Sequence, residues 1–177
     1  AGAAVAAAVQ SLVAIGALED VPGLPLTPLG FHLAHMPVDA RVGKMLVYAA
    51  LCGCLGPVLT IAACLSHKSP FAQGFNLERQ EEQRRARERR FGHLVSDHMA
   101  VVAAFDAYRT AKASQDPEAV PKLVGELGLV PAVLDGMADL RRRFLRHLAE
   151  TGFAQDTDAD GGKQANLHKD NPLLVRC

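Results

Sequence analysis

The sequence predicts a mostly α-helical protein with one short β-hairpin near its start. Hydrophobic residues make up 49% of the 177 residues, which is enough to build a packed core. Aromatic residues make up only 5%, there is no Trp, and Ala and Leu are abundant, a composition that favours packed helices over strands. Apolar residues also recur at helical spacing through most of the longer segments.

The first forty residues predict a helix, a hairpin and a second helix. Residues 3–18 are rich in Ala and favour a helix, whereas residues 18–30 place Pro and Gly between short apolar pieces, as is typical of a hairpin or wing. Thr27 followed by Pro28 is an expected N-cap and first-turn pair, because the hydroxyl satisfies a free amide and proline has none to lose. This order is what a trimmed winged helix would leave.

The rest of the chain predicts further helices. Asp39 and Ser96 are expected N-caps, and residues 77–91 mix glutamates with arginines as in an exposed helix with a solvated face. The expected helical ranges are 3–18, 28–35, 40–51, 57–65, 77–91, 97–108 and 131–151, with a short or irregular helix at 123–130.

A series of motifs follows in a fixed order. They are IGALED (15–20), LTPLGFHLA (26–34), MPVDARVGKML (36–46), GCLGPVLTIAA (53–63), LSHKSPF (65–71) and SDHMAVVAAFDAY (96–108). In this order and at these separations they resemble the helicase-associated region of the DEAH-box RNA helicase family. Residues 139–152 look like the last helix of the same region, whereas residues 125–133 depart from the family pattern.

The resemblance implies how the chain is organised. We expect a partial winged-helix domain in residues 1–40, a ratchet-like helical domain in residues 41–155, and a flexible loop with the start of a missing OB-fold barrel in residues 156–177. The parent protein is then an ATP-dependent RNA helicase whose motor domains, which hold ATP and Mg²⁺, are also missing. The chain has no P-loop spacing and no marked nucleophile set, so we expect it to be catalytically inactive by itself, without a cofactor.

No metal site or membrane span is expected. The four cysteines form no C-x-x-C pair, and three lie in apolar helical sequence, which favours a reduced intracellular setting in the nucleus or the cytoplasm. The acidic segment 156–162 is too short for a calcium-binding EF-hand and predicts a surface loop. Glycines and a proline interrupt the apolar stretch 45–65, so it predicts two buried helices instead of a span.

The resemblance also points to residues near a single-strand RNA channel. In the family, the loop after the second buried helix and the start of the Ser-Asp-His helix lie there, which here means Lys68, Ser69, Phe71, Gln73, Ser96, Asp97 and His98. Structural alternatives stay open: Ser96 and Asp97 as a helix cap, Phe71 as core, and His98 as an ordinary histidine. Two arginines that share one face of their helix, Arg142 and Arg146, are candidate secondary contacts.

The expected partners are single-stranded RNA, the motor domains and OB-fold of the parent protein, and protein activators. Because the net charge is zero, RNA affinity has to be local. One alternative is a protein-interaction scaffold without motor activity, which the absence of upstream motor motifs would indicate. Another is a DNA-binding winged helix, but this predicts a basic recognition helix, for which His32 and His35 are the nearest candidates.

Overall fold

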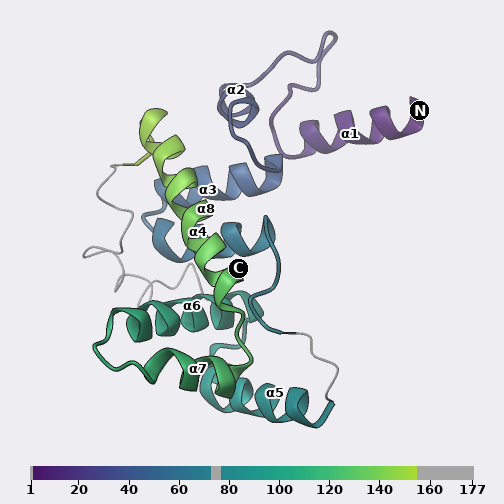
Figure 1. Cartoon of the computed structure of the whole chain (residues 1–177). Coiled ribbons are helices and arrows are strands. Elements are labelled where there is room, and N and C mark those ends of the chain that lie inside the picture. Colours follow the sequence, from purple (N-terminus) through teal and green to yellow (C-terminus); the bar gives the residue numbers. More distant parts are fainter. Residues whose placement is uncertain (1, 73–76, 155–177) are drawn as a thin grey trace.

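The computed structural model describes residues 2–72 and 77–154 and confirms the mostly helical fold (Figure 1). The α-helices are α1 (Gly2–Ala14), α2 (Pro28–Ala34), α3 (Ala40–Leu51), α4 (Leu55–Leu65), α5 (Leu77–Phe91), α6 (Asp97–Ala113), α7 (Ala119–Leu127) and α8 (Pro131–Glu150). A 3-10 helix, Gly92–Leu94, lies between α5 and α6. In these two ranges the β structure consists of isolated antiparallel bridges, Leu18 with Leu26 and Phe71 with Leu129.

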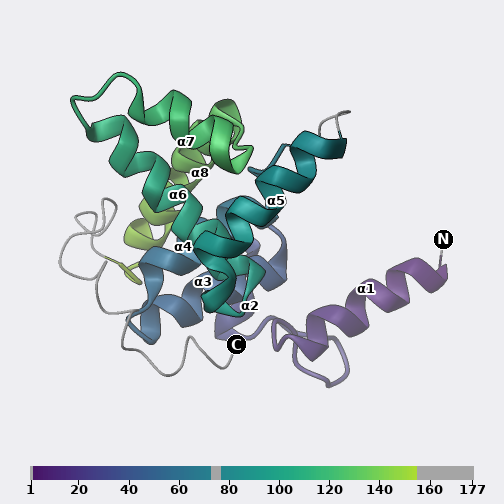
Figure 2. The same cartoon turned by 90° about the horizontal axis from the view of Figure 1, so that it is seen from below.

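The first helix is shorter than predicted, and most of its residues are exposed. α1 ends at Ala14 instead of residue 18, and Leu18 pairs with Leu26 across the hairpin. None of the residues of α1 is buried, and both views show the helix projecting from the body of the molecule (Figure 1, Figure 2). The high helix propensity of Ala explains why this segment is helical. The spacing of its apolar residues predicts a helix face, but it does not show whether another part of the protein covers that face.

The predicted hairpin is reduced to a single bridge, which Thr27 ties to α2. The Thr27 hydroxyl donates to the Gly16 carbonyl at 2.6 Å and accepts from the Gly30 amide at 2.9 Å, so the predicted N-cap is confirmed. A Cβ on Gly30 would lie 1.9 Å from the Ala17 carbonyl oxygen. The glycine of the LTPLG motif is therefore required for α2 to approach the hairpin backbone.

Helix α4 is the centre of the fold. It packs against α3, α6 and α8. Its buried residues are Leu55, Pro57, Val58, Leu59, Thr60, Ala62 and Ala63. A helix surrounded by others is apolar on every side, which explains the continuous apolar run in the sequence. The helix begins at Leu55, before the predicted Pro57, because the first turn tolerates a residue without an amide hydrogen.

The long helix α8 buries a stripe of residues that includes an arginine. Its buried residues are Leu134, Met137, Arg141, Phe144, Leu145 and Leu148. Val133 and Leu140, which lie at helical spacing from the buried Met137 and Phe144, are only half-buried. Spacings of three and four residues define several overlapping stripes on one helix, and the position of α4 selects the stripe that is buried.

Helices α5, α6 and α7 lie together at the end of the molecule opposite α1 (Figure 1). The irregular helix predicted at 123–130 is α7, which begins at Ala119 and ends at Leu127. It is followed by Gly128, whose backbone is left-handed with φ +64°. A Cβ on Gly128 would lie 2.3 Å from the side-chain oxygen of Gln83 on α5. This glycine therefore both ends α7 and allows α5 to pack beside it.

In the part of the chain that the structure describes, no group of three or more His, Cys, Asp or Glu is placed to hold a metal ion. Cys52 is exposed, Cys54 and Cys64 are half-buried, and burial raises the pKa of the Cys64 thiol. No helix of the same part is long and apolar enough to cross a membrane. The acidic segment 156–162 and the expected barrel start lie outside the described residues.

Candidate nucleic-acid interface

The loop between α4 and residue 72 is held in place at two positions. The His67 ring lies against Gly136 of α8, where an added Cβ would come within 3.0 Å of the ring nitrogen Nε2. Pro70 is fully buried, and its carbonyl accepts a hydrogen bond from the Val130 amide at 2.9 Å. Between these two anchors the loop is exposed, which presents the side chains of Lys68 and Ser69 to solvent.

Phe71 joins this loop to the connection between α7 and α8. It is half-buried and forms a β-bridge with Leu129, and the amide of the next residue donates to the Gly128 carbonyl at 2.7 Å. The Phe71 amide donates to the Ser69 hydroxyl at 3.3 Å. These contacts give Phe71 a structural role whatever else it touches.

Arg87 corrects the prediction that the charged helix has only a solvated face. It is half-buried on α5, and its guanidinium lies 4.9 Å from the centre of the Phe71 ring. It also donates to the carbonyl of Leu127, the last residue of α7, at 2.7 Å. A cation at a helix C-terminus interacts favourably with the helix dipole. Burial, and then the nearby charge of Arg84, lower the pKa of Arg87.

The start of α6 confirms the predicted cap. The Ser96 hydroxyl accepts a hydrogen bond from the Met99 amide at 3.4 Å, and Asp97 places a negative charge in the first turn, where the helix dipole favours it. Ser96, Asp97 and His98 are all exposed. Just before the cap, Val95 has a left-handed backbone with φ +53°.

The loop, α5 and the start of α6 border a groove, which we call the α5 groove. It consists of two pockets of about 570 and 490 Å³ that share four lining residues, Ser69, Phe71, Arg84 and Arg87. The larger pocket is also lined by Glu88, Phe91, Val95, Ser96 and Asp97, and the smaller by Glu81. The structure thus brings Ser69, Phe71, Ser96 and Asp97 of the predicted channel residues together.

Four of the other predicted residues, Lys68, His98, Arg142 and Arg146, do not line these two pockets. Lys68 and His98 are exposed on the elements that border the groove, and Gln73 lies outside the described residues. Arg142 and Arg146 are exposed on α8, where Arg142 forms an ion pair with Asp139.

Sequence reasoning did not assign Arg84, Arg87, Phe91 or Val95 to the groove. The arginine run was visible in the sequence, but the interleaved glutamates favoured an exposed helix. The spacing of the run did not show that one side of α5 packs beside α7.

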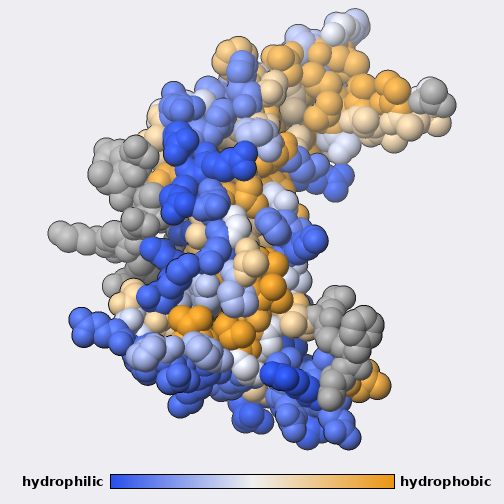
Figure 3. All heavy atoms as spheres, in the orientation of Figure 1, coloured by the Kyte–Doolittle hydropathy of each residue, from blue (hydrophilic) through white to orange (hydrophobic). Residues whose placement is uncertain are grey.

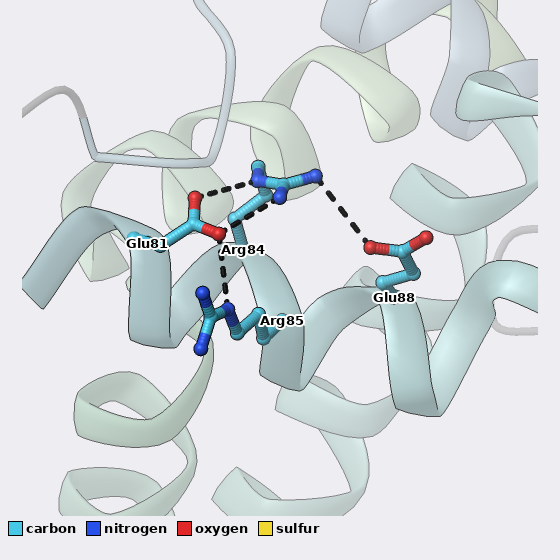
Figure 4. Close-up of polar contacts among 4 residues, drawn as sticks. All are labelled: Glu81, Arg84, Arg85 and Glu88. Atoms are coloured by element: carbon cyan, nitrogen blue, oxygen red, sulfur yellow. Dashed lines mark hydrogen bonds and ion pairs between the residues drawn. The ribbon is translucent and has the colours of Figure 1, made fainter.

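A network of carboxylates holds Arg84 on the groove wall (Figure 4). Its guanidinium lies 2.8 Å from the Glu81 carboxylate and 3.5 Å from the Glu88 carboxylate, one turn to either side, and Glu81 also pairs with Arg85 at 3.0 Å. Hydrogen bonds from Arg84 and then Arg85 lower the pKa of Glu81 to about 2. The groove wall therefore has no free excess of positive charge at neutral pH.

The buried arginine of α8 is a separate feature of the interior. Arg141 donates to the Gly56 carbonyl at 2.7 Å and to the Thr60 hydroxyl, and its guanidinium lies 5.1 Å from the centre of the Phe105 ring. It thereby links α4, α6 and α8. The run of arginines at 141–143 and 146 is thus divided, with one side chain in the core and the exposed Arg142 and Arg146 at the surface.

Fold and groove together define a class of protein: a helical module with a partly apolar surface groove that has no positive excess. Comparison with known proteins identifies the family. Residues 8–38 match the winged-helix part of the helicase associated domain (HA2), and residues 39–101 match its ratchet-like part.

Whole proteins give the same assignment. The chain is 37% identical over 174 residues to the DExH-box ATP-dependent RNA helicase DExH1 of Arabidopsis thaliana, covering 98% of this chain and 17% of that protein. It is 35% identical over 177 residues to the ATP-dependent DNA/RNA helicase DHX36 of Mus musculus (98% and 17%), and 33% identical over 177 residues to the putative ATP-dependent RNA helicase DHX57 of Homo sapiens (91% and 12%). The chain therefore belongs to the helicase-associated (HA2) domain family and corresponds to the helicase-associated region of DExH/DEAH-box RNA helicases. It spans 12–17% of the length of these relatives.

Proposed function

We propose that this chain is the accessory part of an ATP-dependent RNA helicase, in which the α5 groove forms one wall of the channel for single-stranded RNA. The relatives are helicases by name, and each contains a region similar to nearly the whole of this chain. The observation that supports the channel most directly is the convergence of two distant segments on one groove. Ser69 and Phe71 reach it from one loop, and Ser96 and Asp97 from the start of α6.

The chemistry of the groove suits a grip that does not depend on base sequence. Hydroxyl groups, backbone amides at a helix start and basic side chains contact phosphates, while apolar side chains contact the faces of bases. Ser69 and Ser96 supply hydroxyls, and Phe71 supplies apolar surface. Because Arg84 is already paired with two carboxylates, we expect the exposed Lys68 to provide the main phosphate contact. Gln73 and His98 complete the proposed set.

The proposed division of labour follows from what each part supplies. ATP and Mg²⁺ are bound by the motor domains of the parent protein, and this chain provides a surface across which the motors move the strand. By itself it should not hydrolyse ATP. The role implies an intracellular location, in the nucleus or the cytoplasm.

We further propose that residues 1–40 brace the motor domains, residues 41–155 form the ratchet-like part, and residues 156–177 lead toward an OB-fold. An exposed apolar surface supports the bracing role. It includes Val5, Val21, Leu26 and Phe31, each between 47% and 64% exposed. Hydrophobic atoms cover α1, whereas the α5–α7 end is largely hydrophilic (Figure 3). Apolar surface of this kind favours contact with another domain.

The channel proposal is tested by Lys68→Ala and His98→Ala in the full-length helicase. We expect RNA-stimulated ATP hydrolysis and unwinding to fall severalfold, and the salt dependence of RNA affinity to decrease by about 0.7 in logarithmic slope for the lost lysine contact. Lys122→Ala, at an exposed lysine of α7, is the matched control. Unchanged unwinding with unchanged fold stability would reject these contacts. A further drop in Arg142→Ala/Arg146→Ala would support the secondary contacts.

A protein-interaction scaffold is the second candidate, favoured by the exposed apolar surface and by the zero net charge. It predicts that the chain binds a protein partner, such as an activator, through residues 1–40 and that changes in the α5 groove leave this binding intact. RNA binding that depends on the groove would favour the channel over the scaffold.

A further inference from the structure

Val95 combines two unfavourable properties at the edge of the α5 groove. Its backbone is left-handed, with φ +53° and ψ +16°, and its side chain is 93% exposed. A β-branched residue is a conformational outlier in this region, where glycine or asparagine is favoured. Strained residues of this kind persist where the surrounding structure fixes them, and they are concentrated at binding sites.

The neighbouring elements fix this conformation. Val95 ends the 3-10 helix Gly92–Leu94 and directly precedes Ser96, whose hydroxyl caps α6. Only two residues, Val95 and Ser96, connect the 3-10 helix to α6. Glycine would satisfy that geometry without strain, so the backbone alone does not explain an exposed valine.

The composition of the groove indicates which part of a nucleic acid such a valine would contact. The charged lining residues give no positive excess, since two arginines, Arg84 and Arg87, stand against three carboxylates, Glu81, Glu88 and Asp97. A groove without a positive excess attracts phosphates weakly. Apolar lining surface therefore has greater weight in binding.

The valine is the most accessible apolar side chain among the large ones in the groove. Phe91 is 6% exposed, and Phe71 is half-buried with a guanidinium near its ring. Val95 stands 93% exposed beside them.

From the exposure, strain and position of Val95 we infer that its side chain is an apolar contact for a base of single-stranded RNA in the α5 groove. This inference rests on the proposed function. Proteins that hold nucleic acids without sequence preference use the apolar faces common to all bases, and aliphatic side chains pack against unstacked bases. A valine fixed in one backbone conformation loses little conformational freedom when a base packs on it.

The test compares two RNA probes and two glycine variants of the full-length helicase. The probes are a fluorescein-labelled uridine 12-mer and an abasic ribose-phosphate 12-mer, with binding measured by fluorescence anisotropy. Val95→Gly removes the side chain and relieves the strain. The matched control is Leu24→Gly, because Leu24 is also left-handed, with φ +46°, but lies in the hairpin turn outside the groove.

We expect Val95→Gly to bind the uridine 12-mer about threefold to fivefold more weakly, to bind the abasic probe unchanged, and to melt no lower than wild type. Leu24→Gly should bind both probes like wild type. If Val95→Gly binds the uridine 12-mer as tightly as wild type does, the inference is overturned while the proposed function stands. The same conclusion follows if Val95→Gly binds both probes equally more weakly. If Lys68→Ala and His98→Ala leave unwinding by the full-length helicase unchanged, the proposed function fails, and the inference fails with it.

Discussion

Arg141→Met is expected to destabilise the fold without touching the α5 groove. Arg141 is 7% exposed and donates to the Gly56 carbonyl at 2.7 Å and to the Thr60 hydroxyl. Hydrogen bonds from a charged donor contribute about 1.5–3 kcal/mol each, and contact with the Phe105 ring adds about 1 kcal/mol. The Met variant no longer has the cost of burying a guanidinium, and this offsets several kcal/mol of the lost interactions. The net expected loss is about 2–3 kcal/mol.

A loss of that size should lower the melting temperature by about 5–10 °C, given about 2–4 °C per kcal/mol for a domain of this length. Because the chain has no Trp, far-ultraviolet circular dichroism during urea and thermal unfolding is a suitable measurement. The control is Arg142→Met at the neighbouring exposed position, which should change stability by less than about 0.5 kcal/mol.

A double-mutant cycle isolates the contact between Arg141 and the hydroxyl of Thr60, which is 1% exposed. Thr60→Val removes the hydroxyl with little change in shape, and the Arg141→Met/Thr60→Val protein should be at least about 1 kcal/mol more stable than the sum of the single changes predicts. Additive effects would refute a direct energetic link between α8 and α4 at this contact. A cost below about 0.5 kcal/mol for Arg141→Met would refute its structural importance.

Three further changes test local features of the fold. Gly128→Ala should destabilise by about 1–3 kcal/mol because of its left-handed backbone and the contact with Gln83, and Gln83→Ala in the same protein should restore part of that loss in urea unfolding. Thr27→Val should cost about 1–2 kcal/mol, since it removes both the cap of α2 and the tie to the hairpin. For either variant, a urea unfolding midpoint equal to that of wild type would contradict the prediction. The pKa of Glu81 is lowered from 4.5 to about 2, so its stabilising effect is present above pH 4.5 and is lost as the pH falls toward 2. The stability difference between wild type and Glu81→Gln should therefore shrink over that interval, and a difference independent of pH would show that the ion pairs contribute nothing.

Features that depend on neighbouring residues were predictable from sequence. The Thr27 and Ser96 caps, and the Asp39 side chain that accepts from the Arg41 amide at 2.9 Å, all act within three residues of the chain. Their hydrogen bonds depend on local geometry that the residue types already specify. The same holds for the helical character of the charged segment 77–91, which is helix α5.

The groove was only partly predictable. Resemblance to a family indicated Ser69 and Ser96, but nothing in the local pattern indicated that Arg87 is half-buried or that Val95 is strained. Arg87 contacts Leu127, 40 positions away, and the conformation of Val95 depends on how two helices meet. Spacing shows which residues share a helix face, but it does not show what covers that face.

The sequence alone therefore determined the helices, their caps and the family resemblance, because hydrogen bonds between near neighbours and apolar periodicity are local properties. The tertiary structure decided which faces are buried and which charges lie inside. Arg141 shows the difference most clearly: its contact with Gly56 spans 85 positions. Only the packing of α8 against α4 removes this arginine from water, whereas its neighbour Arg142 stays exposed.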